Sequence, residues 1–141
     1  MNMDGTVLNF LNLTQQTATP IEGLQIVVGE GEVFNHVDKN DFMWDSEGDR
    51  VIRQSIIFDQ PFGAVPLVSV GLSGVDASRA QNQRFHLSVE NITCFGFNLV
   101  FVTWGDTKIA RASASWNATG SQKRKMRAVE DIETLFHVSH A

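Results

Sequence analysis

Short apolar segments, separated by turn residues at regular intervals, are the feature that most constrains the fold of this sequence. From residue 50 onward, runs rich in β-branched and aromatic residues alternate with glycine, proline, asparagine and aspartate. Residues 84–89 are apolar at odd positions and polar at even ones, and successive strand side chains face opposite ways, so Arg84 points away from the core. Such closely spaced strand signals predict an all-β sandwich.

Six strand segments can be placed along the chain. They are expected at residues 24–34, 51–58, 67–72, 84–89, 96–104 and 107–116. The first could be one strand or two short strands joined by a tight turn, and residues 73–76 are expected to turn the chain. In the last segment, small residues and Trp116 share one face, which permits close approach of a second sheet or a neighbouring chain.

The two ends of the chain differ from this pattern. Residues 1–22 form an N-terminal extension whose apolar positions suit a helix or a strand equally well. Residues 23–120 are expected to form the β-sandwich domain. In the C-terminal tail, residues 121–141, apolar residues recur at helical spacing and predict a short amphipathic helix over 124–138. Its apolar positions are Val129, Ile132, Leu135 and Phe136.

Composition narrows the class of partner. The net charge of −5 offers no positive field for nucleic acid, and no run approaches the roughly 20 apolar residues of a membrane span. Cys94 is the single cysteine, so neither an intrachain disulfide nor a thiolate metal cluster is expected. We predict no cofactor and no metal. Because the N-terminal residues lack the positive charge of a secretory signal, a cytoplasmic or non-classically exported protein is expected.

No catalytic motif is present, so the sequence predicts a binding protein and not an enzyme. The residues that suggest binding are Trp104 at a strand-to-turn junction, the outward Arg84 and an acidic loop around Trp44. A sugar can stack its C–H face on an aromatic ring while its hydroxyls pair with guanidinium and carboxylate groups. From the residues alone, Trp104 could equally be part of the core.

The stretch from residue 50 to 118 resembles the H-type lectins, a family that also includes the C-terminal domain of the discoidins. The matching residues are Arg50, Ile56, Phe58, Pro61, Phe62, Pro66 to Leu72, Asp76, Asn82, Arg84, Asn91 to Thr93, Gly96, Phe97, Thr103, Trp104, Thr107, Ser115 and Trp116. The resemblance implies a six-stranded antiparallel β-sandwich. It also implies a homo-oligomer, a trimer or a hexamer, that binds glycans of the galactose or N-acetylgalactosamine type between protomers.

The resemblance also assigns roles to individual residues. Arg84 and an acidic loop residue, Glu47 or Asp45, would hold the sugar hydroxyls, and Trp104 would stack on the ring, whereas Trp116 would be a core residue. The chain departs from the family at Gly105, often a histidine that reads the acetamido group, and at Ala110, commonly a tyrosine of the pocket. These departures keep a second hypothesis open, a trimeric structural, assembly or attachment module with a degenerate sugar site.

Overall fold

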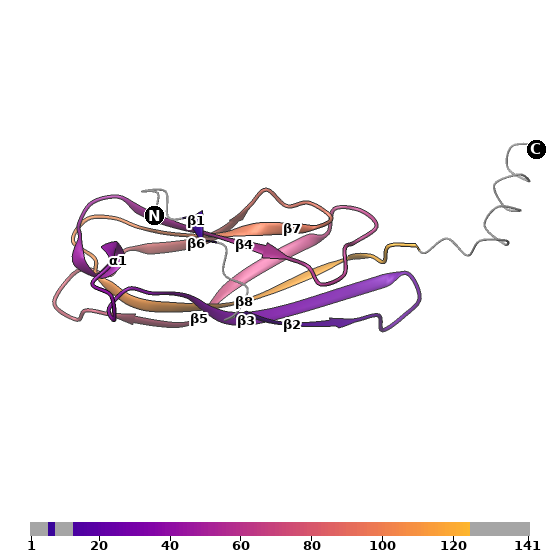
Figure 1. Ribbon diagram of the computed structural model, residues 1–141, viewed down its shortest axis with the longest axis horizontal. Helices are drawn as coiled ribbons and strands as arrows, with labels where there is room; N and C mark the ends of the chain where they lie inside the picture. The colour runs from indigo at the N-terminus through magenta and orange to yellow at the C-terminus, as the bar shows by residue number, and fades with distance from the viewer. Residues whose placement is uncertain (1–5, 8–12, 125–141) are drawn as a thin grey trace, which may run out of the picture.

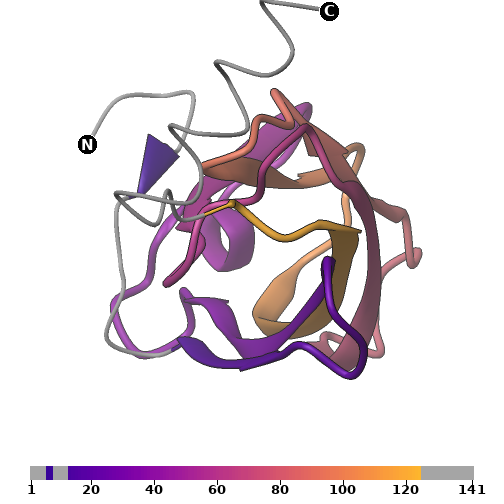
Figure 2. The ribbon, with the colours of Figure 1, turned by 90° about the vertical axis from the view of Figure 1, so that its right-hand side faces the viewer.

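Two four-stranded β-sheets pack face to face in the computed structural model, which describes residues 6–7 and 13–124 (Figure 1). One sheet has the order β1 (Thr6–Val7), β4 (Arg50–Ile57), β7 (Gly96–Thr103) and β6 (Phe85–Glu90). The other has the order β2 (Leu13–Ala18), β3 (Leu24–Asn35), β8 (Ile109–Ser121) and β5 (Leu67–Ala77). The end-on view in Figure 2 shows both sheets curving around one core. The predicted all-β antiparallel sandwich is confirmed.

Six of these strands, β3 to β8, correspond to the six segments expected from the sequence, and they pair antiparallel. The N-terminal segment contributes two more. Residues 13–18, which suited a helix or a strand, form β2: they pair antiparallel with β3, and their exposure alternates residue by residue, as in a strand with one face toward the core. β1 pairs in parallel with β4. The predicted C-terminal helix falls almost wholly after residue 124, outside the described residues, and the division into three segments stays a prediction.

The chain continues as a strand where one turn was expected and another was possible. β3 is a single strand of 12 residues that passes through Gly29 and Gly31, which settles the choice between one strand and two. β5 continues through residues 73–76, where shifts of register between Leu72 and Gly74 and after Asp76 mark bulges. A bulge absorbs an extra residue by local twisting, so the glycine there bends the strand without ending it.

Trp116 is at the centre of the core, where its exposed fraction is 3%. Its ring centroid lies 5.1 Å from that of Phe97 and 6.0 Å from that of Phe58. Gly29 lies opposite Trp116 on the neighbouring strand, and a Cβ atom there would overlap the indole atoms Cε2 and Cζ2. The small inward residues of β8, such as Ala114, therefore admit the opposing sheet of the same chain.

The short helix α1 (Phe42–Asp45) lies at one end of the sandwich, on the left in Figure 1. The same end holds the loop from residue 35 to 49, the connection from β5 to β6 and the turn from β7 to β8. In the part of the chain that the structure describes, no helix has the length and apolar character needed to span a membrane. The strands thus gather the segments that carry the expected site residues at one end.

Candidate functional site

Two buried threonines fix the backbone of Arg84 against the β7–β8 turn. The hydroxyl of Thr107 accepts the Arg84 amide N–H at 3.0 Å and donates to the carbonyl of Asn82 at 2.6 Å. The hydroxyl of Thr103 donates to the carbonyl of Arg84. Both threonines are at most 1% exposed. Their position explains why an Asn-x-Arg segment accompanies a Thr-Trp-x-x-Thr segment in this sequence.

The Arg84 side chain extends over the turn and remains partly open to solvent. Its Nη1 lies 3.2 Å from Oδ1 of Asp106, which also accepts from the Asn82 amide at 3.3 Å. The side chains of Arg84 and Asp106 are each 42% exposed. Gly105 has φ +68°, and a Cβ atom there would lie 2.9 Å from Arg84 Nη1. A side chain at residue 105 would therefore meet the guanidinium group.

Arg50 joins the acidic loop to the same turn. It is 7% exposed, and its guanidinium donates to the carbonyls of Gly48 at 2.9 Å, Ser46 at 2.8 Å and Gly105 at 3.2 Å. The Gly48 amide also donates to the Gly105 carbonyl, at 2.9 Å. Burial lowers the pKa of Arg50 below its ordinary value, and the nearby Glu47 carboxylate opposes that shift. The loop and the turn are therefore held side by side.

Trp104 is 42% exposed and borders a hollow of about 330 Å³. The hollow is lined by Asp49, Arg50, Val51, Val102, Thr103 and Trp104. The partial exposure of Trp104 contrasts with the burial of Trp116 and leaves its ring available to a ligand. The open choice between core and surface for Trp104 is thus resolved in favour of the surface.

The structure brings some of the expected site residues together and leaves others apart. Arg84 contacts Gly105 and Asp106 directly. Asp45 and Glu47 are exposed on the adjacent loop, and no ion pair or hydrogen bond in the described part of the chain joins either of them to Arg84. Their expected contact with a sugar stays a prediction.

Ala110 is buried, at 4% exposure, so it does not line a surface pocket as the equivalent tyrosine does in the family pattern. The sequence interpretation did not assign roles to Asp106, Asp49 or Arg50. The available signal was the aspartate that follows Trp104-Gly105 in the β7–β8 turn, whose carboxylate meets Arg84.

His36 holds the acidic loop in place through a hydrogen bond with the backbone of helix α1. Its Nδ1 accepts the Met43 amide N–H at 3.0 Å, so this nitrogen carries no proton. The ring is buried between Phe34 and Phe42, with centroid distances of 4.9 and 4.7 Å. Burial lowers the pKa of His36 below its ordinary 6.5, Asp41 opposes this shift and Lys39 adds to it.

We expect stability to fall as the pH is lowered through 6.5, because the unfolded chain then takes up a proton that folded His36 resists. The contribution is complete above 6.5 and is lost as the pH falls toward the lowered pKa of the folded state. Urea midpoints measured between about pH 7.5 and pH 5 should show this slope. His36→Asn should flatten it, whereas His86→Asn, at an exposed histidine, should keep it. An equal slope in His36→Asn would contradict this assignment.

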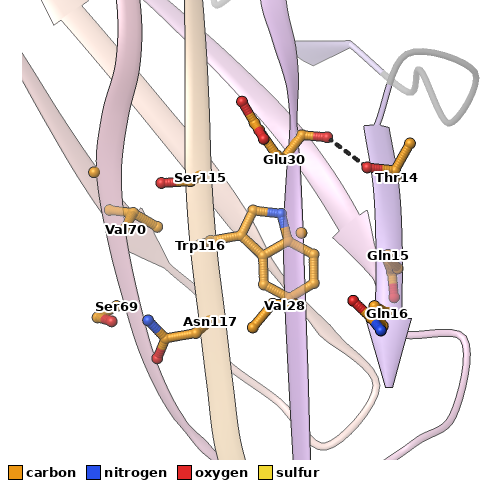
Figure 3. Close-up of a pocket in the computed structure, with 12 residues that line it drawn as sticks. Thr14, Gln15, Gln16, Val28, Glu30, Ser69, Val70, Ser115, Trp116 and Asn117 are labelled. Carbon is orange, nitrogen blue, oxygen red and sulfur yellow. Dashed lines mark hydrogen bonds between the residues drawn. The ribbon is translucent and has the colours of Figure 1, made fainter. Parts of the chain in front are cut away.

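A larger hollow of about 860 Å³ lies on the outer face of the sheet β2-β3-β8-β5 (Figure 3). Its exposed lining is mostly small or uncharged, and Glu30 is the one charged side chain in it. The Thr14 hydroxyl donates to the Glu30 carbonyl there, at 3.3 Å. None of the expected site residues lines this hollow.

Comparison with known proteins supports the same family. The H-type lectin domain model matches residues 53–119. The "ATP synthase subunits region ORF 7" protein of Fuscovulum blasticum is 42% identical over 101 residues, which cover 70% of this chain and 88% of that protein. Discoidin-2 of Dictyostelium discoideum is 41% identical over 63 residues, 44% of this chain and 24% of the relative.

A solved structure shares the fold as well. The structure of recombinant discoidin II of Dictyostelium discoideum aligns with a TM-score of 0.61 and 28% identity, over 73% of this chain and 40% of that chain. This chain thus spans less than half the length of the discoidins that it matches. The family match, the identities and the shared sandwich agree: the chain belongs to the H-type lectin domain family and is a lectin-like domain related to the discoidins.

Proposed function

We propose that this chain is a lectin for glycans of the galactose or N-acetylgalactosamine type, and that it presents several sites by assembling into a trimer or hexamer. The observation that carries the proposal is the half-exposed Arg84 guanidinium, whose backbone Thr103 and Thr107 fix against the turn that carries the half-exposed Trp104. The proposed site consists of Arg84, Trp104, Gly105 and the acidic loop residues Asp45 and Glu47.

The chemistry of this end of the sandwich suits a neutral sugar. A sugar hydroxyl group can accept a hydrogen bond from the Arg84 guanidinium and donate one to a carboxylate. A cation and several acids at this end of the sandwich can therefore satisfy both the acceptor and the donor of a hydroxyl group. The exposed indole of Trp104 offers an apolar face to the C–H groups of a pyranose ring. Gly105 places no side chain at the position that would select the acetamido group. Its presence therefore supports binding of the broader class of galactose-type glycans.

Assembly of several copies would multiply the strength of a shallow site. A site built on the half-exposed Arg84 and Trp104 would bury little of a sugar, and linking several such sites raises the overall avidity without any new contact. The hollow on the outer face of the sheet β2-β3-β8-β5 supports assembly because Glu30 is its one charged side chain, and the same face exposes Val28 and Leu67. Exposed apolar groups of this kind are common at protein interfaces.

The second candidate is an assembly or attachment module whose sugar site has degenerated. Arg84 is already paired with Asp106, which favours this alternative because a sugar must compete with that contact. A glycan array separates the two functions once light scattering has established the oligomeric state. Binding to galactose-terminated glycans that free galactose displaces supports the lectin. A well-formed trimer that binds no glycan contradicts the lectin and favours the assembly module.

Substituting Trp104 by alanine should weaken binding to the glycan selected on the array by about fivefold, since stacking on one aromatic ring is worth roughly 1 kcal/mol. The thermal midpoint should change little because the ring is already 42% exposed. Phe95→Ala is the matched control: Phe95 is 60% exposed at the opposite end of β7 and should leave affinity unchanged. Equal affinity of Trp104→Ala and wild type in calorimetric titration would rule out the stacking role.

A further inference from the structure

Arg50 is a buried cation whose hydrogen bonds go to backbone carbonyls. Its guanidinium, 7% exposed, donates to the carbonyls of Ser46, Gly48 and Gly105 and lies 3.4 Å from that of Met43. In the described part of the chain no carboxylate oxygen lies within ion-pair distance of it, and Glu47 acts on it only at longer range. A buried charge is costly unless it is hydrogen-bonded, and four of the five guanidinium N–H donors meet a carbonyl acceptor here.

The acceptors come from two segments that are distant in sequence. Met43, Ser46 and Gly48 belong to helix α1 and the acidic loop, whereas Gly105 belongs to the β7–β8 turn. The planar guanidinium can reach both because its donors diverge in one plane, a geometry that a lysine ammonium lacks. Only one other hydrogen bond, from the Gly48 amide to the Gly105 carbonyl, joins these segments among the described residues.

We propose that Arg50 is the positioning residue of the glycan site. It holds the acidic loop, with Asp45 and Glu47, against the turn that carries Trp104, so that the loop carboxylates and Arg84 face one bound sugar. The role rests on the proposed lectin function, and Arg50 acts through the loop instead of through the sugar. Because the loop is fixed before binding, the free energy of glycan binding is not reduced by the entropic cost of ordering the loop.

The test compares Arg50→Lys with Arg53→Lys in the full chain. Arg53 is a matched control because it lies on the same strand and pairs with Glu90 at 3.2 Å, away from the loop. We expect Arg50→Lys to bind the array-selected glycan at least about tenfold more weakly and Arg53→Lys to bind like wild type. If circular dichroism shows that Arg50→Met folds, this variant gives a stricter test, because methionine has neither the charge nor the hydrogen-bond donors of arginine.

Hydrogen exchange gives a readout that a general loss of stability does not reproduce. In Arg50→Lys the amides of Ser46 and Gly48 should exchange faster while those of strands β4 and β7 keep wild-type protection, and saturating glycan should restore the loop amides. Wild-type affinity in Arg50→Lys would overturn the positioning role alone, since the wild type still binds. Failure of the wild type to bind any glycan would overturn the lectin function and this role with it.

Discussion

Arg84→Ala is expected to lower glycan affinity by about a hundredfold or more, because a charged donor contributes roughly 1.5–3 kcal/mol per hydrogen bond and the guanidinium can make two. The fold should persist. The contacts that fix this position come from the backbone of Arg84 to Thr103 and Thr107, and an ion pair this exposed adds little stability. Calorimetric titration with the glycan chosen on the array measures the loss.

Arg111→Ala provides the control for removal of a cation. Its Nε lies 3.3 Å from Oδ2 of Asp76, and its side chain is 54% exposed, so the pair resembles that of Arg84 and Asp106 but lies on the other sheet. It should bind glycan like wild type. Retained binding in Arg84→Ala would show that the glycan occupies another surface, and equal losses in both variants would indicate a nonspecific effect of charge.

Gly29→Ala should destabilise the protein by about 3 kcal/mol or more, since an added Cβ overlaps the Trp116 indole at the centre of the core. The ring cannot move away easily because Phe58 and Phe97 pack against it. A much lower urea midpoint, or failure to fold, is the expected result. Combining Gly29→Ala with Trp116→Phe should recover part of the loss because the smaller ring leaves room for the methyl group.

Gly71→Ala tests whether the destabilisation expected for Gly29→Ala arises from overlap with the core and not simply from replacing a glycine within a strand. Gly71 lies on the outer face of β5, where an added Cβ meets nothing within 4 Å. This variant should match or slightly exceed wild-type stability because alanine restricts the unfolded chain. Equal destabilisation of both variants would contradict the proposed role of the Gly29–Trp116 contact.

The strand pattern was predictable from the sequence because it depends on local alternation. The alternation of apolar and polar residues over 84–89 placed Arg84 outside the core, and burial in β8 alternates in the same way. The family resemblance assigned Trp116 to the core, where it is 3% exposed. Gly29 was harder to interpret, since glycine in an apolar run is typical both of a turn and of a close contact. Only the register that sets it opposite Trp116 distinguishes the two.

The candidate site was predictable in part and for a different reason. Arg84 and Trp104 were recognisable from the family pattern, but the contact of Arg84 with Asp106 depends on how the Asn82 segment closes onto the β7–β8 turn. Arg50 forms its bridge with carbonyls from residues as far away as 105, and backbone acceptors leave no signature in side-chain sequence. The sequence pattern therefore does not predict which loops, distant in sequence, pack against each other.

The uneven burial of the tryptophans has a spectroscopic consequence. The chain has three tryptophans and no tyrosine, so its emission comes from indole when it is excited at wavelengths that phenylalanine does not absorb. Trp116, at 3% exposure, should emit at short wavelength and resist quenching by iodide, whereas Trp104, at 42%, should be quenched readily. One unlabelled sample can thus report unfolding through the emission of the buried Trp116 and glycan binding through the emission of the exposed Trp104.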